Sequence, residues 1–229
     1  MANRRPAQQP QRSENRADYQ IAFLQRVHRL IQLAYESLAP GDYENAEEDD
    51  ITGELCKHMK HLTEIAPSEK WMARFSIHDQ DPSNDVPSPE TGKIRKGKRR
   101  PKIDVRLVCK HRTPNRGYCV EAKRLYRSDS VSEYVDDEGI GAFISGDYAK
   151  DDDFGGMVGY VQTDSVATWL PKLEAKLAAD PSLKRSTKGN AWEKTEFTRG
   201  PKICFQSSHE REGRGGIVII HIILPFLRS

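Results

Sequence analysis

Two short apolar segments of the chain carry acidic and basic residues at a spacing that suits acid, base and metal chemistry. Asp104 lies in KIDVRLVC, and Glu121 and Lys123 lie in GYCVEAKRL, with the turn residues Pro114 and Asn115 between the two segments. Two carboxylates on neighbouring strands can hold a hard cation, which prefers oxygen ligands, and such a cation polarises a phosphate and activates a water. A lysine beside them can position that water or neutralise developing charge.

The spacing of these residues predicts that they meet on one face of a hairpin. Residues 102–109 and 117–125 have the composition of two antiparallel strands, and a pairing centred on the turn sets residues whose numbers sum to 225 opposite each other. Asp104 then lies against Glu121, and Lys123 shares their face because side chains alternate along a strand. The opposite face is apolar: Ile103, Val105, Leu107, Cys109, Tyr118, Val120 and Ala122. We therefore expect the three polar residues on an otherwise charged face, while the apolar face packs on helices.

This arrangement resembles the PD-(D/E)xK nuclease family, which includes many restriction and repair endonucleases. The resemblance covers roughly residues 46–170 and rests on Pro101-Lys-Ile-Asp104, followed 17 positions later by Glu121-Ala122-Lys123. The family's usual Pro-Asp pair is split here by two residues. The resemblance implies a magnesium-dependent nuclease, with manganese able to substitute, in which Asp104, Glu121 and the Ala122 carbonyl bind the metal and Lys123 assists the attack of water. It also implies an α/β (mixed α+β) fold, a restriction-endonuclease-like mixed central sheet flanked by helices.

The family often takes a further acid from a helix that precedes the first strand. Residues 44–62 have a helical pattern with acids crowded in its first turn. Glu48 is the first candidate because it lies near the core-facing side of that helix, and Asp50 and Glu54 are the next. The competing interpretation is that these acids only complement the positive end of the helix dipole.

A basic stretch leads directly into Asp104. Seven of the ten residues 93–102 are Lys or Arg, at the end of a predicted long loop over residues 78–102. Such a cluster would draw a phosphate backbone toward the site, whereas a solvated loop without a partner is the alternative. The residues expected to contact nucleic acid are Lys96, Lys98, Arg99, Arg100 and Lys102. Local clusters are required because the whole chain, with 36 Lys and Arg against 34 Asp and Glu, has a net charge of only +2.

The other expected elements follow from composition and periodicity. Residues 1–16 predict a disordered basic tail before a single domain over residues 17–229. Helices are expected over residues 18–38 and 157–177, the second interrupted by Pro171. Strands are expected around residues 71–77, 202–207 and 216–224, the last central in the sheet because it is apolar on both faces. Gln162 or Tyr160 would supply the polar residue that the family often places on the helix after its ExK strand.

Cysteine spacing and hydropathy argue against several other classes of protein. The four cysteines form no CxxC pair, so we expect reduced, buried thiols and neither a zinc ribbon nor a CxxC redox site. Glu54, His58 and His61 share a helix face, but HExxH is absent and no third ligand segment accompanies them. No P-loop or Rossmann glycine motif is present. No apolar run approaches the roughly 20 residues that span a bilayer, and we expect a cytoplasmic protein.

The sequence therefore predicts a metal-dependent phosphodiesterase that cleaves nucleic acid, most simply a DNA endonuclease. A role in antiviral defence or restriction follows only by analogy with the family. The competing hypothesis is a non-catalytic nucleic-acid-binding or assembly subunit that retains the nuclease fold. The choice between DNA and RNA stays open, as does the choice between a homodimer and a complex with a second protein subunit.

Overall fold

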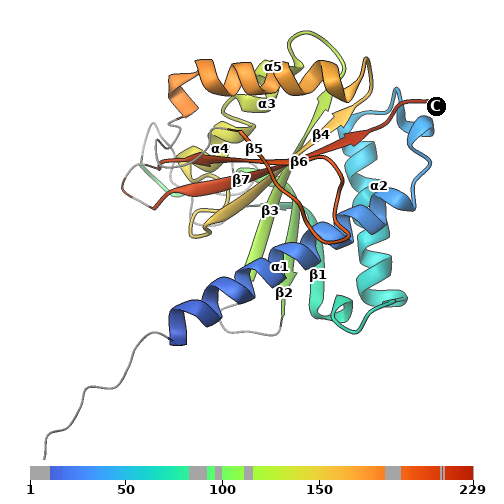
Figure 1. Cartoon of the computed structure of the whole chain (residues 1–229), viewed down its shortest axis with the longest axis vertical. Coiled ribbons are helices and arrows are strands. Elements are labelled where there is room, and N and C mark those ends of the chain that lie inside the picture. The colour runs from blue at the N-terminus through green and yellow to red at the C-terminus, as the bar shows by residue number, and fades with distance from the viewer. Residues whose placement is uncertain are drawn as a thin grey trace, which may run out of the picture.

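A seven-stranded mixed sheet with helices on both faces forms the centre of the molecule (Figure 1). The computed structural model describes residues 11–82, 92–95, 100–110, 116–183, 192–211, 213 and 215–228. The strand order is β1-β2-β3-β4-β7-β6-β5. The strands are β1 (Phe75–Pro82), β2 (Lys102–Cys109), β3 (Arg116–Leu125), β4 (Phe154–Val161), β5 (Glu193–Lys194), β6 (Cys204–His209) and β7 (Ile217–Pro225). The mixed α/β architecture expected from the sequence is confirmed.

The central strands run parallel and the outer ones antiparallel. β3 pairs in parallel with β4, and β4 pairs in parallel with β7. β1, β2 and β3 are successively antiparallel, as are β5, β6 and β7. Parallel strands need crossover connections, and here the crossover between β3 and β4 contains helices.

Two layers of helices cover the sheet, each over its own apolar cluster. α1 (Gln11–Glu36) and α2 (Glu48–Lys60) pack on one face, and α3 (Ser130–Val135), α4 (Ile140–Ser145) and α5 (Val166–Ala179) on the other. Shorter helical turns are η1 (Pro40–Tyr43), η2 (His61–Ile65), η3 (Met72–Arg74) and η5 (Pro181–Leu183). Both faces of the sheet are therefore buried, and a polar side chain on either face needs a partner inside the protein.

The first helix is longer than the periodicity predicted. It begins at Gln11, so residues 11–16 belong to α1 instead of the disordered tail assigned to residues 1–16, and residues 1–10 lie outside the described residues. The segment QRSENR contains no Pro or Gly, so it can extend a helix whose later turns are fixed by packing. Its apolar stripe packs as expected, with Leu24, Val27, Ile31 and Ala34 buried.

The strand predicted at residues 71–77 forms later in the chain. Residues 72–74 form the turn η3, and β1 continues to Pro82, so residues 78–82 are strand rather than the expected loop. They pair with β2, for example Asp79 with Val105 and Asp81 with Ile103. β1 is an edge strand, and polar residues are tolerated there because one side faces solvent. The prediction relied on apolar residues, and these end at Ile77, whereas β1 continues to Pro82.

The helix predicted over residues 157–177 is wrong in its first part. Residues 154–161 form β4, an inner strand, and the helix α5 begins only at Val166, with Pro171 inside it. Glycines weaken a strand pattern in the sequence, but here they make room for aromatic rings. A Cβ at Gly155 would lie 2.6 Å from a ring carbon of Phe143, and one at Gly156 would lie 2.9 Å from the Tyr118 ring.

β7 is the interior strand that its apolar sequence predicted. It lies between β4 and β6, with Ile220 and Ile222 in one apolar cluster and Ile219 and Ile223 in the other. The four cysteines are free and buried, as expected. Among the described residues, no helix is long and apolar enough to cross a membrane.

A buried hydrogen-bonded chain links β6, β7 and α3. Ser207 Oγ lies 2.7 Å from both His209 Nε2 and His221 Nε2, and His221 Nδ1 lies 3.0 Å from the Tyr134 hydroxyl. His209 Nδ1 donates to the Leu183 carbonyl at 2.7 Å, so its Nε2 accepts from Ser207, which in turn accepts from His221. Each member has a donor facing an acceptor, and burial holds the pKa of His221 well below its ordinary value.

Candidate active site

The predicted register of the hairpin is confirmed up to the point where its two strands part. β2 and β3 pair with residue numbers that sum to 225, from Cys109 opposite Arg116 to Val105 opposite Val120. This ladder ends one residue before Asp104 and Glu121. The candidate residues therefore lie where β3 presents an edge that is no longer paired with β2.

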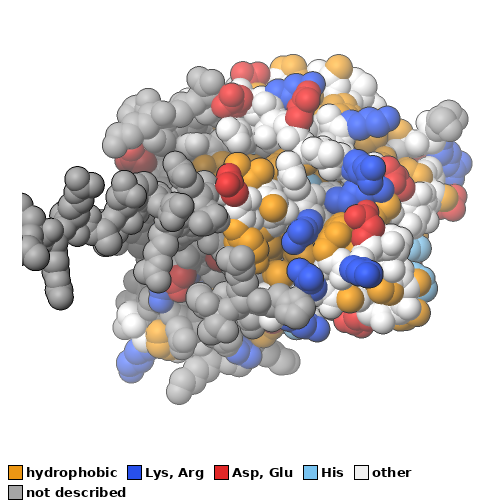
Figure 2. Space-filling model, turned by 60° about the horizontal axis from the view of Figure 1, so that its bottom comes forward, with side chains coloured by type: hydrophobic (Ala, Val, Ile, Leu, Met, Phe, Trp, Pro, Cys, Tyr) orange, Lys and Arg blue, Asp and Glu red, His pale blue; other side chains and the backbone are white. Residues whose placement is uncertain are grey.

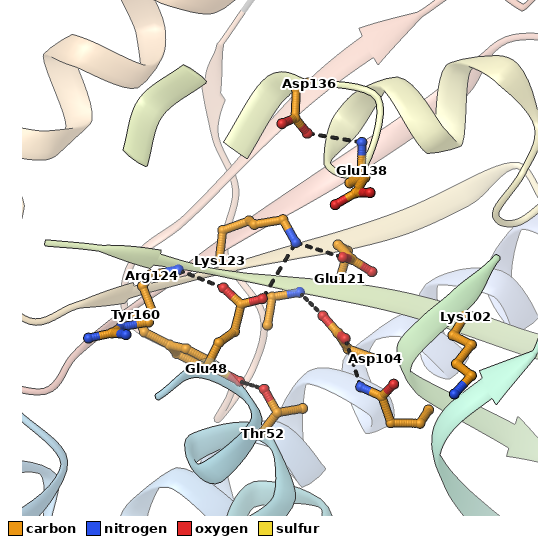
Figure 3. Close-up of polar contacts among 12 residues, drawn as sticks. Glu48, Thr52, Lys102, Asp104, Glu121, Lys123, Arg124, Asp136, Glu138 and Tyr160 are labelled. Carbon is orange, nitrogen blue, oxygen red and sulfur yellow. Dashed lines mark hydrogen bonds and ion pairs between the residues drawn. The ribbon is translucent and has the colours of Figure 1, made fainter. Parts of the chain in front are cut away.

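Two carboxylates bind the backbone of β3 along that edge (Figure 3). The Ala122 N–H donates to Asp104 Oδ2 at 2.8 Å, and the Arg124 N–H donates to Glu48 Oε2 at 3.0 Å. The N–H and C=O of one strand residue point to the same edge, so the Ala122 carbonyl also faces the side of Asp104. Asp104, Glu48 and this carbonyl therefore lie at one edge of β3.

Glu121 and Lys123 form a buried ion pair beside these groups. Lys123 Nζ lies 2.8 Å from Glu121 Oε1 and 3.5 Å from Glu48 Oε1. Glu121 is 4% exposed and Asp104 8% exposed. Among the described residues no donor lies within hydrogen-bond distance of the buried Glu121 Oε2, although the Glu121 carboxyl group is close enough to that of Asp104 to share a proton with it. Burying such an oxygen is costly unless it gains a proton or a cation.

The face that carries Glu121 and Lys123 is not the open charged surface expected from the sequence. Cys119 and Leu125, which alternate with them along β3, are buried in the cluster under α3, α4 and α5. The prediction was wrong because β3 is an inner strand with helices on both faces, whereas an isolated hairpin would have one wet face. Ile103 also belongs to this cluster and not to the opposite apolar face, since β2 has already left β3 at this point.

Burial, with the charges of neighbouring acids, raises the pKa values of all three carboxylates. Burial, together with the neighbouring charge of Asp104, raises the pKa of Glu121 to about 8. Burial also raises the pKa values of Asp104 and Glu48. Burial alone would lower the pKa of Lys123, but Glu121, Glu48 and Asp104 together raise it above its ordinary value. If ionised, three carboxylates and one ammonium leave two negative charges, which match one divalent cation.

The other two helix acids lie away from this cluster. Glu54 pairs with Lys57 on the exposed side of α2, with 3.0 Å between Lys57 Nζ and Glu54 Oε2. Asp50 is exposed. Glu48 is therefore the acid that α2 contributes, and it does so from the first residue of that helix.

Gln162 holds the chain segment that leads into α2. Its Nε2 donates to the carbonyls of Tyr43 at 2.8 Å and Ala46 at 2.9 Å, and its Oε1 accepts from Arg124 Nε at 2.7 Å. These bonds occupy the amide, so Gln162 positions Glu48 and does not reach the carboxylates.

Tyr160 and Gln162 were expected on a helix, but they lie in β4 and directly after it. The Tyr160 hydroxyl lies 3.0 Å from Thr52 Oγ1 and fixes α2 against the sheet. Both residues were placed on the wrong element because residues 157–161, which belong to β4, were predicted to be helical.

Part of the predicted basic segment lies next to Glu121. Arg100 and Lys102 line a cavity of about 360 Å³ together with Glu121. Lys96, Lys98 and Arg99 lie outside the described residues. On the face shown in Figure 2, Lys and Arg side chains alternate with acidic ones, in agreement with the small net charge.

Two residues that hold the site were missed. Gln80 Nε2 donates to Asp104 Oδ1 at 3.3 Å, and Arg124 stacks over the Tyr126 ring with its guanidinium carbon 4.1 Å from the ring centroid. Gln80 lies in a segment taken for a loop, and its positive φ of 51° gives no sequence signal. Arg124 could have been found from the sequence, because it directly follows Lys123 in the same predicted strand.

The metal-binding capacity of the cluster is limited to a few ligands. Within the described ranges, no group of three or more His, Cys, Asp or Glu is arranged to hold an ion. This includes Glu54, His58 and His61, the rival site considered above. Mg²⁺ is compatible with such a site, because it keeps several waters and is bound through one or two carboxylates plus substrate phosphates.

Comparison with known proteins gives no relative. No protein-family model, no curated protein and no solved structure matches the chain.

Proposed function

We propose that the protein is a magnesium-dependent nuclease of the PD-(D/E)xK type, acting on DNA, with its site at Asp104, Glu121, Lys123 and Glu48. The observation that carries the proposal is the buried Glu121 Oε2, which has no partner among the described residues although it lies beside Asp104 and Lys123. A cluster that served only stability would pair this oxygen, because a buried unpaired acceptor costs about 1–3 kcal/mol. The restriction-endonuclease-like arrangement of the sheet is part of the same proposal.

The donor set suits a hard divalent cation. Glu121 Oε2, the carboxylate of Asp104 and the Ala122 carbonyl are all oxygen donors at the place where β2 and β3 part. Both Asp104 oxygens already accept one hydrogen bond each, which orients the carboxylate and leaves further lone pairs. A bound cation would polarise the scissile phosphate and lower the pKa of an attacking water.

Lys123 acts as a donor in this scheme and not as a base. Its raised pKa keeps Nζ protonated near neutral pH, and Glu48 and Glu121 hold it in place. A fixed ammonium can stabilise negative charge that develops on the phosphate. Glu48 is a positioning residue for Lys123 and the Arg124 backbone, and Gln162 in turn fixes the segment before Glu48.

Cleavage assays on four substrates test the proposal. Plasmid, linear duplex, single-stranded DNA and RNA are incubated with Mg²⁺ or Mn²⁺, and Asp104→Asn and Glu121→Gln are expected to abolish cleavage while circular dichroism stays unchanged. Lys123→Arg keeps the charge but not the geometry, and we expect at least about a tenfold loss of single-turnover rate with nucleic-acid binding retained.

Two acids on the same helix provide a matched control. Glu48→Gln should slow cleavage, whereas Glu54→Gln, which removes only an exposed pair with Lys57, should not. Cleavage by Asp104→Asn or Glu121→Gln at the wild-type rate would overturn the assigned site.

A second candidate function is a non-catalytic nucleic-acid-binding or assembly subunit. It is favoured by the absence, among the described residues, of a group of three metal-binding side chains. The same assays decide between the two, because the subunit would bind nucleic acid without needing a divalent cation and would cleave none of the four substrates.

A further inference from the structure

The cavity beside Glu121 has one acidic and one basic wall. Glu121, Asp137 and Glu138 line it together with Arg95, Arg100 and Lys102, and its volume is about 360 Å³. Arg95 is held by an ion pair with Asp147. The cavity is therefore lined both by groups that attract a cation, Glu121 among them, and by groups that attract an anion.

A rigid turn between α3 and α4 carries the acidic wall. Asp136 Oδ1 accepts the Glu138 N–H at 2.9 Å, and the Asp136 carbonyl accepts the N–H groups of Gly139 at 3.0 Å and Gly141 at 2.8 Å. A Cβ at Gly141 would lie 2.6 Å from the Asp136 carbonyl oxygen, and a Cβ at Gly139 would collide with the carbonyl of Tyr134. The backbone of Glu138 is thus fixed, while its exposed side chain stays adjustable.

The position of this turn over the site is visible in the close-up. Figure 3 shows Asp136 and Glu138 on the side of Lys123 and Glu121 that lies away from α2. Lys123 contributes to the pKa of Asp136, and Glu121 and Glu138 both contribute to that of Tyr148, so these groups lie near one another. Glu138 lines the same cavity as Glu121, and its exposed side chain follows the turn that faces Glu121 in the close-up.

We infer that Glu138 is a further carboxylate ligand of the divalent cation that Glu121 binds, and that the basic wall receives a phosphate group of the substrate. Glu121 is more than nine-tenths buried, its Oε2 has no hydrogen-bond partner among the described residues, and it lines the same cavity as Glu138. Asp104 and Glu121 bring two carboxylates to the site, and the described residues hold no preassembled group of three, so the exposed Glu138 side chain would turn toward the cation to add a third ligand. This inference rests on the proposed cation site and adds a residue to it.

Isothermal titration of the full chain with Mn²⁺ alone, without nucleic acid, tests the inference. Glu138→Gln should weaken Mn²⁺ binding at least about tenfold, because even changes in groups that only support metal ligands commonly cost that much. Asp137→Asn, one residue earlier and on the same cavity wall, is the matched control for a general loss of negative charge. Glu133→Gln, which removes only an exposed pair with Arg127, is a second control.

Each outcome separates the added residue from the site itself. A loss confined to Glu138→Gln and Glu121→Gln supports the inference. If Glu138→Gln binds Mn²⁺ as tightly as the wild type, or if Asp137→Asn loses as much affinity as Glu138→Gln, the role of Glu138 is wrong. In either case, a loss of Mn²⁺ affinity in Glu121→Gln still supports the proposed function. Wild-type affinity in Glu121→Gln, or no Mn²⁺ binding by the wild type, overturns both.

Discussion

The raised pKa of Glu121 makes the stability of the metal-free protein depend on pH. The unfolded chain releases this proton near the ordinary value of 4.5, whereas the folded protein keeps it up to about 8. Between these values the folded state binds more protons, so raising the pH destabilises it, by at most about 1.4 kcal/mol per pH unit. Replacing Glu121 with Gln removes the titrating group but keeps its shape, and should remove this dependence.

The range from pH 6.5 to 8 isolates this effect. The buried histidines act in the opposite sense, since burial lowers the pKa of His28 to about 4, and their contribution changes mainly below pH 6.5. Asp152, whose pKa burial raises to about 6, also changes mainly below this range. Over this interval the free energy of unfolding should fall by roughly 1–2 kcal/mol more in the wild type than in Glu121→Gln.

Urea unfolding in EDTA at several pH values measures this difference. Mg²⁺ binding at pH 7 should then release a proton from Glu121, because a group with a pKa of about 8 is still mostly protonated at that pH. Titration calorimetry in buffers of different ionisation enthalpy measures that release. Equal pH dependence in the wild type and Glu121→Gln, or Mg²⁺ binding without proton release, would refute the reasoning.

Three further predictions concern the fold and the basic wall. Ser207→Ala leaves two buried imidazole nitrogens without their partner and should lower the free energy of unfolding by roughly 2–4 kcal/mol, measured in urea. Gly155→Ala should cost about 1–3 kcal/mol in thermal denaturation through overpacking, whereas Gly53→Ala, with open space around it in a helix, should be neutral or stabilising. Replacing Arg100 and Lys102 with Gln should flatten the dependence of nucleic-acid affinity on salt; an unchanged slope would assign these charges another role.

The part of the site that depends on local spacing was predictable from the sequence. The spacing of the two segments predicted the register of the β2–β3 ladder, and just beyond the end of that ladder Asp104 accepts a hydrogen bond from the Ala122 N–H, next to Glu121. The helical period placed Glu48 near the core-facing side of α2, where it bonds the backbone of β3. In both cases the position of the side chain follows from the regular repeat of a strand or a helix, so the pattern of a few neighbouring residues is enough to predict it.

The parts that depend on distant segments were not predictable in this way. β4 lies in the sheet because it pairs with β3 and β7, and its glycines are explained only by the rings of Phe143 and Tyr118 that pack against it. The apolar cover over Glu121 comes from helices that follow β3 in the chain. Glu138 belongs to an acid-rich segment in which no period distinguishes one carboxylate from its neighbours.

The charge balance of the cluster favours ligand binding over a purely structural ion pair. Replacing a buried ion pair with well-packed apolar residues is often neutral or stabilising, so stability alone gives little reason to bury Asp104, Glu121 and Lys123 together. The single charge of Lys123 balances only one of the three nearby carboxylates, and burial together with the charge of Asp104 raises the pKa of Glu121 to about 8. Filling this position with a divalent cation would neutralise the remaining charge and use the one carboxylate oxygen left without a partner among the described residues. The arrangement therefore costs stability in the metal-free protein, and that cost is the quantity that the pH dependence of Glu121 measures.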